Sequence, residues 1–400
     1  MAIPTVLVAQ TPVVDRDRDP ALDASKRLAA DLQKANAHSG EWYLLSRIRL
    51  ADIGYSQSFY VPTGDTGGGL SVAVEAPQKL YFVPHKKVAL SAEFNPGYAW
   101  ISNGDRRGQF MYNARADAQF LFNHLYLDGY VQRADALRAR AGDINRLVTA
   151  RETETGLNGE LKYSSRTSLL FEASLAQLTY PRRNRLQPSN IPVELYDRDT
   201  TRERVSLNHK TFPHTSLYFA GEHAKYDFHN AGYKNSERTY GAAGFRFRGT
   251  RWGLSAEAGP ARLTFDDPAQ HDYSGVFGEL TASIEGKKKS LAATLQRDSD
   301  FTLMANNNYY ILTRASATYE YAATNRLTLR ATSNGERDDY DVPVSGHIRR
   351  DTIQFHALGW RYALHHWRGG FDVGYYQRRS TFAGDEDDGI RLIVDLSFTP

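Results

Sequence analysis

The sequence predicts an all-β protein, namely a transmembrane, antiparallel, up-and-down β-barrel of about 18 strands that follows a short N-terminal helix. Three observations lead to this fold class. Apolar and polar residues alternate along most of the chain, short turns alternate with long polar loops, and one side of the alternation carries almost no charge. An alternation with a period of two indicates strands whose two faces meet different surroundings.

Composition excludes several other classes. The 400 residues are 41% hydrophobic and 24% charged, which excludes a mainly disordered chain. The mean hydropathy is −0.54 and no long apolar run exists, so helical membrane spans are excluded, whereas membrane strands are not. No cysteine is present, which excludes disulfides and thiol chemistry. The net charge of +3 is too balanced to indicate nucleic acid, and we predict no such partner.

The first element is a helix. Residues 20–37 carry the clearest helical pattern, with Pro20 before it and Gly40 after it. One face collects Ala21, Ala24, Leu28, Leu32 and Ala35. We therefore expect residues 1–41 to form a periplasmic tail with a helix at 20–37. The start lacks the charged region of a complete signal peptide, so a remnant of one and a disordered tail stay open as alternatives.

Residues 42–400 form the predicted barrel. Phe110–Phe122 and Tyr309–Tyr321 each place aromatic residues at the ends of an apolar face and small residues in its middle. Aromatic girdles on both sides of a lipid-facing band produce this arrangement. The predicted strands are 43–58, 69–82, 87–101, 109–122, 124–134, 147–163, 167–180, 203–212, 215–227, 238–249, 252–265, 273–285, 290–298, 308–322, 326–334, 351–363, 370–379 and 390–398. Gly54, Pro77 and Pro84 interrupt the first two strands, so about 16 strands is the alternative count.

The connections alternate in length. Short links are predicted at 123–124, 164–166, 213–214, 249–251, 286–289, 323–325 and 365–368, and long polar loops at 134–146, 181–202, 228–237, 266–272, 299–307, 335–350 and 380–389. This alternation is typical of outer-membrane barrels, which have short periplasmic turns and long outer loops. An even strand count places both termini on the periplasmic side.

The two faces of the strands differ in charge. Outward positions such as Leu70, Leu90, Leu217 and Phe371 are almost free of charge. An outward Lys or Arg at mid-depth would cost about 2–4 kcal/mol, so hydrocarbon explains the pattern better than a core, which would need a second layer. Inward positions carry both signs of charge and several tyrosines. The candidate lumen-lining residues are Arg115, Asp117, Tyr126, Asp128, Glu172, Tyr218, Glu222, Arg246, Arg248, Glu279, Tyr310, Arg314, Arg330, Asp372, Tyr376, Arg378, Arg391 and Asp395.

No local motif predicts catalysis, a metal site or a cofactor. His365–His366 lacks carboxylate partners at the spacing that a metal site needs. Lys287–Lys289 is interpreted as a solvated basic turn, with contact to lipid headgroups as the alternative. Asp385–Asp388 is interpreted as a solvated loop rather than a cation site. Ser, His and acidic residues are scattered over different strands, and such groups converge only in space. An outer-membrane enzyme that modifies lipid or polysaccharide therefore stays as an alternative.

Four short motifs resemble the outer-membrane β-barrel porin type 2 family. They are Arg166–Phe171 (RTSLLF), Gly54–Phe59 (GYSQSF), Pro84 before Val88–Leu90, and Ile393–Phe398 (IVDLSF). The resemblance would cover about residues 42–400. The family usually has acidic or Asn residues where Ser56, Gln57 and Ser58 stand, and here Thr399 and Pro400 follow the final aromatic residue. The Phe398 ending otherwise resembles the signal read by the barrel-assembly machinery.

Barrels of this family often accompany exopolysaccharide gene clusters. The resemblance therefore implies a role related to exopolysaccharide, in the outer membrane of a Gram-negative-type bacterium. Tyrosines beside arginines and carboxylates suit a hydroxyl-rich ligand, because sugar faces stack and hydroxyls find hydrogen-bond partners. We therefore expect a channel for exopolysaccharide export with a periplasmic export partner and outer-membrane lipid around it. The alternatives are a general or substrate-selective porin for small hydrophilic solutes, and a water pore whose charges merely pair with each other.

Overall fold

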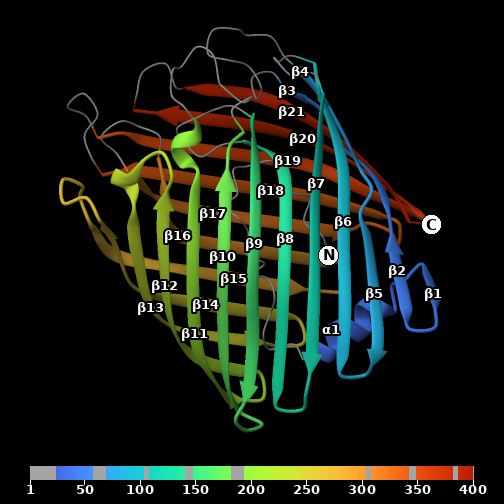
Figure 1. Ribbon diagram of the computed structural model, residues 1–400. Coiled ribbons are helices and arrows are strands. Elements are labelled where there is room, and N and C mark those ends of the chain that lie inside the picture. Colours follow the sequence, from blue (N-terminus) through green and yellow to red (C-terminus); the bar gives the residue numbers. More distant parts are fainter. Residues whose placement is uncertain are drawn as a thin grey trace.

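The chain forms one antiparallel sheet that closes on itself (Figure 1). The computed structural model describes residues 24–56, 69–102, 108–139, 147–181, 193–302, 308–341, 348–381 and 386–399. The barrel closes where β21 (Asp387–Phe398) pairs with β3 (Ile48–Ser56). The predicted all-β, closed barrel is confirmed.

The elements follow one another as a meander. One helix, α1 (Ala24–Leu32), precedes the strands, and η2 (Val193–Tyr196) and η3 (Gly232–Lys234) are single turns in loops. The remaining strands are β1 (Ala37–Ser39), β2 (Trp42–Ser46), β4 (Gly69–Glu75), β5 (Gln78–His85), β6 (Val88–Ile101), β7 (Gly108–Leu121), β8 (Leu125–Ala139), β9 (Leu147–Lys162), β10 (Thr167–Thr179), β11 (Arg198–Phe212), β12 (Thr215–Phe228), β13 (Ser236–Arg248), β14 (Trp252–Phe265), β15 (Tyr273–Glu285), β16 (Lys289–Phe301), β17 (Tyr309–Ala322), β18 (Leu327–Tyr340), β19 (Arg350–Leu364) and β20 (Trp367–Ser380).

The wall contains 18 strands, as the sequence predicts. β2 and β3 follow each other along one wall strand, and β4 and β5 along the next, because β4 pairs with the upper part of β6 and β5 with its lower part. Pro77 lies in the gap between β4 and β5 and has no N–H for the ladder. Its carbonyl instead accepts a hydrogen bond from the Arg47 N–H at 3.0 Å.

The two ends of the barrel differ as predicted. Short turns join the strands at the lower end in Figure 1, and the long connections lie at the upper end. The strands run further into the loops than expected: β8 reaches Ala139, β11 begins at Arg198 and β18 reaches Tyr340. Polar residues there continue the backbone ladder, which composition alone did not indicate.

The helix is shorter than predicted and contacts the barrel wall. It spans Ala24–Leu32, so it ends before residue 37, and Ala37, the last residue of the expected helix 20–37, belongs to β1; residues before 24 lie outside the described part. Leu28 packs against Tyr81 and Ala89, and Asp31 accepts a hydrogen bond from the Tyr81 hydroxyl at 2.7 Å. Tyr81 lies opposite Ser91, on the inward face, so α1 occupies the bore at the short-turn end. No described helix is long and apolar enough to cross a membrane.

The wall departs from a regular barrel between β15 and β16. These strands pair only from Gly278 opposite Arg297 to Glu285 opposite Ser290. Above this point β16 and β17 stay paired with each other up to Phe301 opposite Tyr309. Above this point the wall is therefore open between β15 and β16, and the hairpin, whose β17 stays paired with β18 up to Tyr310 opposite Tyr340, turns into the bore.

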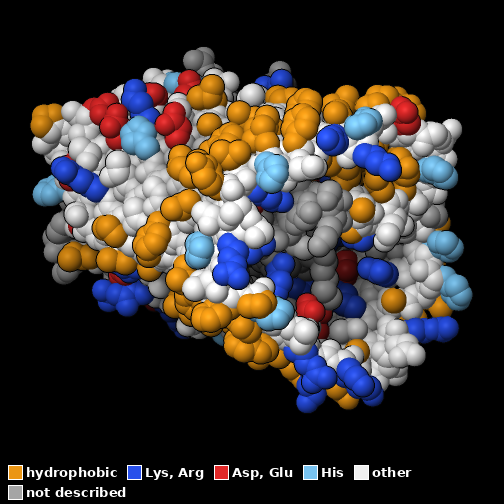
Figure 2. Space-filling view, turned by 90° about the horizontal axis from the view of Figure 1, so that it is seen from below, with side chains coloured by type: hydrophobic (Ala, Val, Ile, Leu, Met, Phe, Trp, Pro, Cys, Tyr) orange, Lys and Arg blue, Asp and Glu red, His pale blue; other side chains and the backbone are white. Residues whose placement is uncertain are grey.

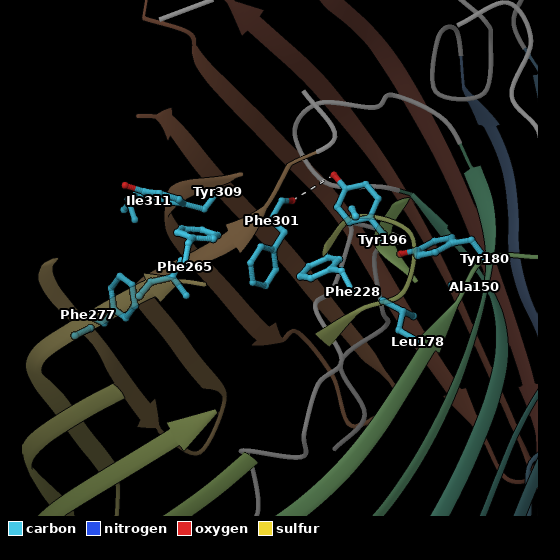
Figure 3. Close-up of a cluster of buried hydrophobic side chains, with 13 residues drawn as sticks. Ala150, Leu178, Tyr180, Tyr196, Phe228, Phe265, Phe277, Phe301, Tyr309 and Ile311 are labelled. Atoms are coloured by element: carbon cyan, nitrogen blue, oxygen red, sulfur yellow. Dashed lines mark hydrogen bonds between the residues drawn. The ribbon is translucent and has the colours of Figure 1, made fainter. Parts of the chain in front are cut away.

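An apolar cluster holds the displaced hairpin (Figure 3). The Phe301 ring packs on Phe228 with ring centroids 4.9 Å apart, and Tyr309 stacks on Phe265 at 5.9 Å. The sequence places Tyr309 and Ile311 in an outward aromatic girdle, and this prediction is wrong: they are only 3% and 7% exposed and lie inside the barrel. The bore, which the sequence predicts to be polar, is therefore apolar at its loop end.

The outer face of the wall remains apolar and uncovered. Outward side chains such as Leu175, Phe219 and Leu358 are 62%, 67% and 69% exposed. Among the described residues a single sheet forms the molecule, so no second layer covers this face. The predicted uncharged outer side thus exists as an exposed apolar surface.

Candidate functional site

A polar cavity lies in the bore between the apolar cluster and the short-turn end. Its volume is about 590 Å³, and residues from β7 to β16 line it. Eight basic and eight acidic side chains take part, so the cavity is balanced in formal charge. They are Arg115, Arg202, Arg204, Lys210, Arg238, Arg246, Arg248 and Arg297 with Asp128, Glu154, Glu160, Glu172, Glu222, Glu257, Glu279 and Asp298.

The structure divides the predicted lumen-lining residues between two walls. Nine line the cavity: Arg115, Tyr126, Asp128, Glu172, Tyr218, Glu222, Arg246, Arg248 and Glu279. Asp117 lies beside them and accepts a hydrogen bond from Arg115 at 2.7 Å. The other eight belong to β17, β18, β20 and β21 and do not line this cavity: Tyr310, Arg314, Arg330, Asp372, Tyr376, Arg378, Arg391 and Asp395.

Glu222 is the centre of an ion-pair network on β11–β14. Its side chain is 2% exposed and accepts from Arg202 at 2.6 Å, from Arg238 at 2.5 Å and from Arg204 at 3.3 Å. Two of these cations have a second carboxylate: Arg204 contacts Glu257 at 2.6 Å, and Arg238 contacts Asp298 at 3.0 Å. Buried charges of this kind are stable only when each has partners, and the network satisfies that requirement.

Two tyrosines present flat faces with an arginine against each. The Arg115 guanidinium lies 4.1 Å from the Tyr130 ring centroid, and that of Arg246 lies 4.4 Å from the Tyr218 ring centroid. The Tyr130 hydroxyl donates to Glu154 at 2.8 Å. Such cation–π contacts fix both groups and leave the guanidinium edges as donors.

Glycines make room for these rings. Gly156 lies directly opposite Tyr130, and Gly244 directly opposite Tyr218. A Cβ on Gly156 would come within 2.6 Å of the tyrosine Cζ, and one on Gly244 within 2.3 Å. Each ring therefore lies across a glycine on the neighbouring strand, which is a reason for glycine at these two strand positions.

Three cavity cations, Arg246, Arg297 and Lys210, have no acidic partner among the described residues; Arg297 donates to the Thr313 hydroxyl at 3.2 Å. Arg246 contacts only the Tyr218 ring, and Lys210 forms no ion pair there. On the acidic side, Glu279 accepts a hydrogen bond from Thr281 at 3.3 Å. These side chains can donate to or accept from a solute without first breaking an ion pair.

On the opposite wall, most charged side chains form ion pairs with one another. Arg314 contacts Glu336 at 2.5 Å, and Asp351, which is fully buried, accepts from Arg349 at 2.7 Å and from Arg378 at 2.8 Å. Nearer the short-turn end Arg361 bridges Asp372 at 2.5 Å and Asp395 at 3.5 Å, and Arg330 approaches Glu320 at 3.9 Å. Tyr310, Tyr376 and Arg391 are on the same wall. These contacts pair most charges of this wall within the protein, whereas both carboxylate oxygens of the fully buried Asp338 lack a hydrogen-bond partner among the described residues.

Several cavity residues were not among the predicted set. Arg202 falls inside the loop predicted at 181–202, and Arg238 opens a predicted strand. The signal was present in β11, where Arg202, Arg204 and Ser206 share the face opposite to Val205 and Leu207. Extending that alternation toward the loop would have found them.

The described residues hold no group of three His, Asp or Glu side chains suited to a metal ion. Of the acidic run 385–388, Asp385 lies outside the described residues, and Asp388 accepts a hydrogen bond from the Tyr375 hydroxyl at 2.9 Å.

Comparison with known proteins shows the fold class. No family model matches the chain, and no curated protein matches it, so the resemblance to the porin type 2 family stays a prediction. Solved structures do match along nearly the whole chain. OccAB4 of Acinetobacter baumannii has a TM-score of 0.53 at 12% identity and covers 91% of this chain and 99% of its own.

Two further structures agree. OpdK of Pseudomonas aeruginosa, solved with vanillate, has a TM-score of 0.53 at 14% identity and covers 89% of this chain and 99% of its own. A BenF-like porin from Pseudomonas fluorescens Pf-5 has a TM-score of 0.52 at 11% identity, with 89% and 99% covered. The chain thus has the fold of 18-stranded porin-type barrels.

Proposed function

We propose that the protein is an outer-membrane channel of a Gram-negative-type bacterium that passes small hydrophilic solutes selectively. The observation that carries this proposal is the charge-balanced cavity inside a closed barrel with an apolar outer face. Hydrocarbon is the solvent that suits such an outer face, and the part of the barrel in which β15 and β16 pair leaves no unpaired edge in it. The fold shared with porins, and the naming of those relatives as porins rather than enzymes, support a channel over an enzyme.

The cavity favours solutes that carry both charges or many hydroxyls. Equal numbers of basic and acidic side chains give no overall preference for one sign of charge. Arg246 and Lys210 offer cationic donors, whereas Glu279 offers a carboxylate on another strand. A zwitterion or a polyol can contact both kinds of group at once. OpdK was solved with vanillate, a small solute, which is consistent with passage of small molecules through this fold.

A liposome-swelling assay tests the proposal. Purified protein reconstituted in vesicles should admit small zwitterions and polyols faster than monovalent anions or cations of the same size. Arg246→Gln should slow the preferred solutes, whereas Arg262→Gln, on the outward face of β14, should not. Equal rates for all solutes would contradict selectivity, and no swelling together with no conductance in planar bilayers would contradict the channel itself.

Exopolysaccharide export remains a second candidate. The tyrosine rings at Tyr130 and Tyr218, each with an arginine against it, favour it, because sugar faces stack on aromatic rings. Helix α1 and the displaced β16–β17 hairpin occupy the bore on either side of the cavity. A polymer extends beyond the cavity at both ends, so export requires both elements to move. Vesicles loaded with a fluorescent oligosaccharide ladder separate the candidates: an export channel releases long chains, and a solute channel retains them.

A further inference from the structure

Eight short turns at one end of the barrel contain basic residues and no acidic ones, although Glu41 lies in the β1–β2 turn at the same end. Eight connections between β5 and β20 lie at this end, at residues 86–87, 122–124, 163–166, 213–214, 249–251, 286–288, 323–326 and 365–366. Each contains Lys, Arg or His, and none contains Asp or Glu. Figure 2 views this end: blue and pale-blue side chains are spread around the hollow among orange ones, and red side chains are fewer. We call these connections the basic rim.

The Lys and Arg side chains of the basic rim are unpaired, whereas several toward the opposite end have carboxylate partners. Arg166, Arg251, Lys287 and Lys288 are exposed and form no ion pair with any described residue. Toward the loop end, by contrast, several exposed basic side chains have carboxylates: Lys225 contacts Asp227 at 3.1 Å, Arg350 contacts Asp339 at 2.7 Å, and Arg379 contacts Glu386 at 3.6 Å. Five of the eight turns contain Lys or Arg and the other three contain His, and unpaired positive charge repeated around the barrel calls for an anionic partner from outside the chain.

Outward aromatic residues lie next to the basic rim. Tyr163 is 87% exposed, Trp252 follows Arg251 and is 51% exposed, and Trp367 precedes Arg368 and is 48% exposed. Trp and Tyr prefer the boundary between hydrocarbon and headgroups. The neighbouring cations are therefore at headgroup depth on the outer circumference of the barrel.

We propose that the basic rim binds anionic phospholipid headgroups of the leaflet at the short-turn end. This inference rests on the proposed membrane location but not on what the channel carries. Each Lys or Arg near an anionic surface contributes about 1 kcal/mol of attraction. The distribution of the cations around the circumference, beside aromatic anchors, favours lipid over a polymer that would enter at the central mouth.

The test uses the full-length protein in detergent, titrated with phosphatidylglycerol or phosphatidylcholine and analysed by native mass spectrometry for retained lipid. Wild-type protein should retain phosphatidylglycerol preferentially, and salt should weaken the preference because it screens exposed charges. The variant R166Q/R251Q/K287Q/K288Q should lose the preference, by roughly fivefold for each cation at a given headgroup. The matched control K225Q/R262Q/R350Q/R379Q removes the same charge at the loop end and should keep it.

The possible outcomes distinguish lipid binding by the basic rim from other roles of these cations. Equal retention of both lipids by wild-type protein, or equal loss in the rim variant and the control, overturns the proposal. Binding of dextran sulfate that depends on the rim cations, without any phosphatidylglycerol preference, would assign the rim to a polyanionic polymer and overturn the lipid assignment. Unboiled gel migration checks that each variant folds, and the salt titration of wild-type protein tests the proposal even if a variant does not. Conductance should persist in the rim variant, so failure here is distinguishable from failure of the channel proposal.

Discussion

Replacing Glu222 by Gln tests the ion-pair network of the cavity most directly. The side chain is 2% exposed, and three guanidinium groups lie within 3.3 Å of its oxygens. The substitution keeps the shape and removes one negative charge. Arg204 and Arg238 retain Glu257 and Asp298, but Arg202 loses the only ion pair it has with a described residue.

The expected cost is about 3 kcal/mol. Removing one partner of a buried ion pair costs about 3–5 kcal/mol, and the low end applies here because two of the three cations keep a carboxylate and the new amide oxygen still accepts a hydrogen bond. Urea unfolding of the reconstituted barrel, followed by unboiled gel migration, measures the change. Glu203→Gln, on the exposed outward face of the neighbouring strand, is the control and should change stability by less than about 0.5 kcal/mol.

The same variant makes a prediction about ion selectivity. Glu222→Gln leaves eight basic and seven acidic side chains around the cavity, so the channel should come to prefer anions. Arg246→Gln reverses the imbalance and should favour cations. Reversal potentials under a potassium chloride gradient measure both. Unchanged stability of E222Q, or reversal potentials that shift in the same direction for both variants, would refute the argument that this network sets the charge of the cavity.

Three further predictions concern packing. Gly244→Ala should displace the Tyr218 ring, cost about 1–3 kcal/mol and alter solute preference in swelling assays, whereas Gly241→Ala, where a Cβ meets open space, should be tolerated. Leu28→Asp should release α1 from the bore and raise single-channel conductance; unchanged conductance would show that the helix does not restrict flow. Phe301→Ala should cost about 3–5 kcal/mol and give larger, less steady currents, since it removes the ring that anchors the displaced hairpin; currents like those of the wild type would contradict that anchoring role.

The strands and their two faces could be predicted from the sequence because hydrocarbon and water impose opposite demands on alternating positions. Leu217 and Phe219 face out, and Tyr218 faces the cavity, as the period of two indicates. The candidate site was predicted only in part. Period-two alternation predicts which face each residue is on, but it does not predict which inward residues lie close together. The sequence therefore predicted one set of lumen-lining residues, in which nine that line the cavity stood together with residues on β17–β21 that do not, such as Arg314 and Asp372.

The loop ends of the strands were harder to predict, since their composition is that of a loop. Arg198 to Arg202 looks like a polar connection, yet it extends β11 and supplies a cavity cation. Helix α1 shows the opposite error. Its apolar spacing extends past Leu32, but the chain forms a hairpin there because residues 37–39 pair with β2, a contact made only in the folded barrel.

The displaced hairpin shows why one alternating pattern can serve two environments. Along β17 the apolar face runs without interruption from Tyr309 to Tyr321, and nothing in the residue types marks a change. Tyr319, near the short-turn end, is 39% exposed on the outer face, whereas Tyr309, on the same face of the strand, is 3% exposed inside the bore. The change occurs because the ladder to β15 ends at Gly278, so the upper hairpin, which stays paired with β18, packs that face against the inner wall. Lipid and a packed apolar cluster both accept an apolar side chain, so the alternation predicts the face of each residue but cannot tell which of the two covers it.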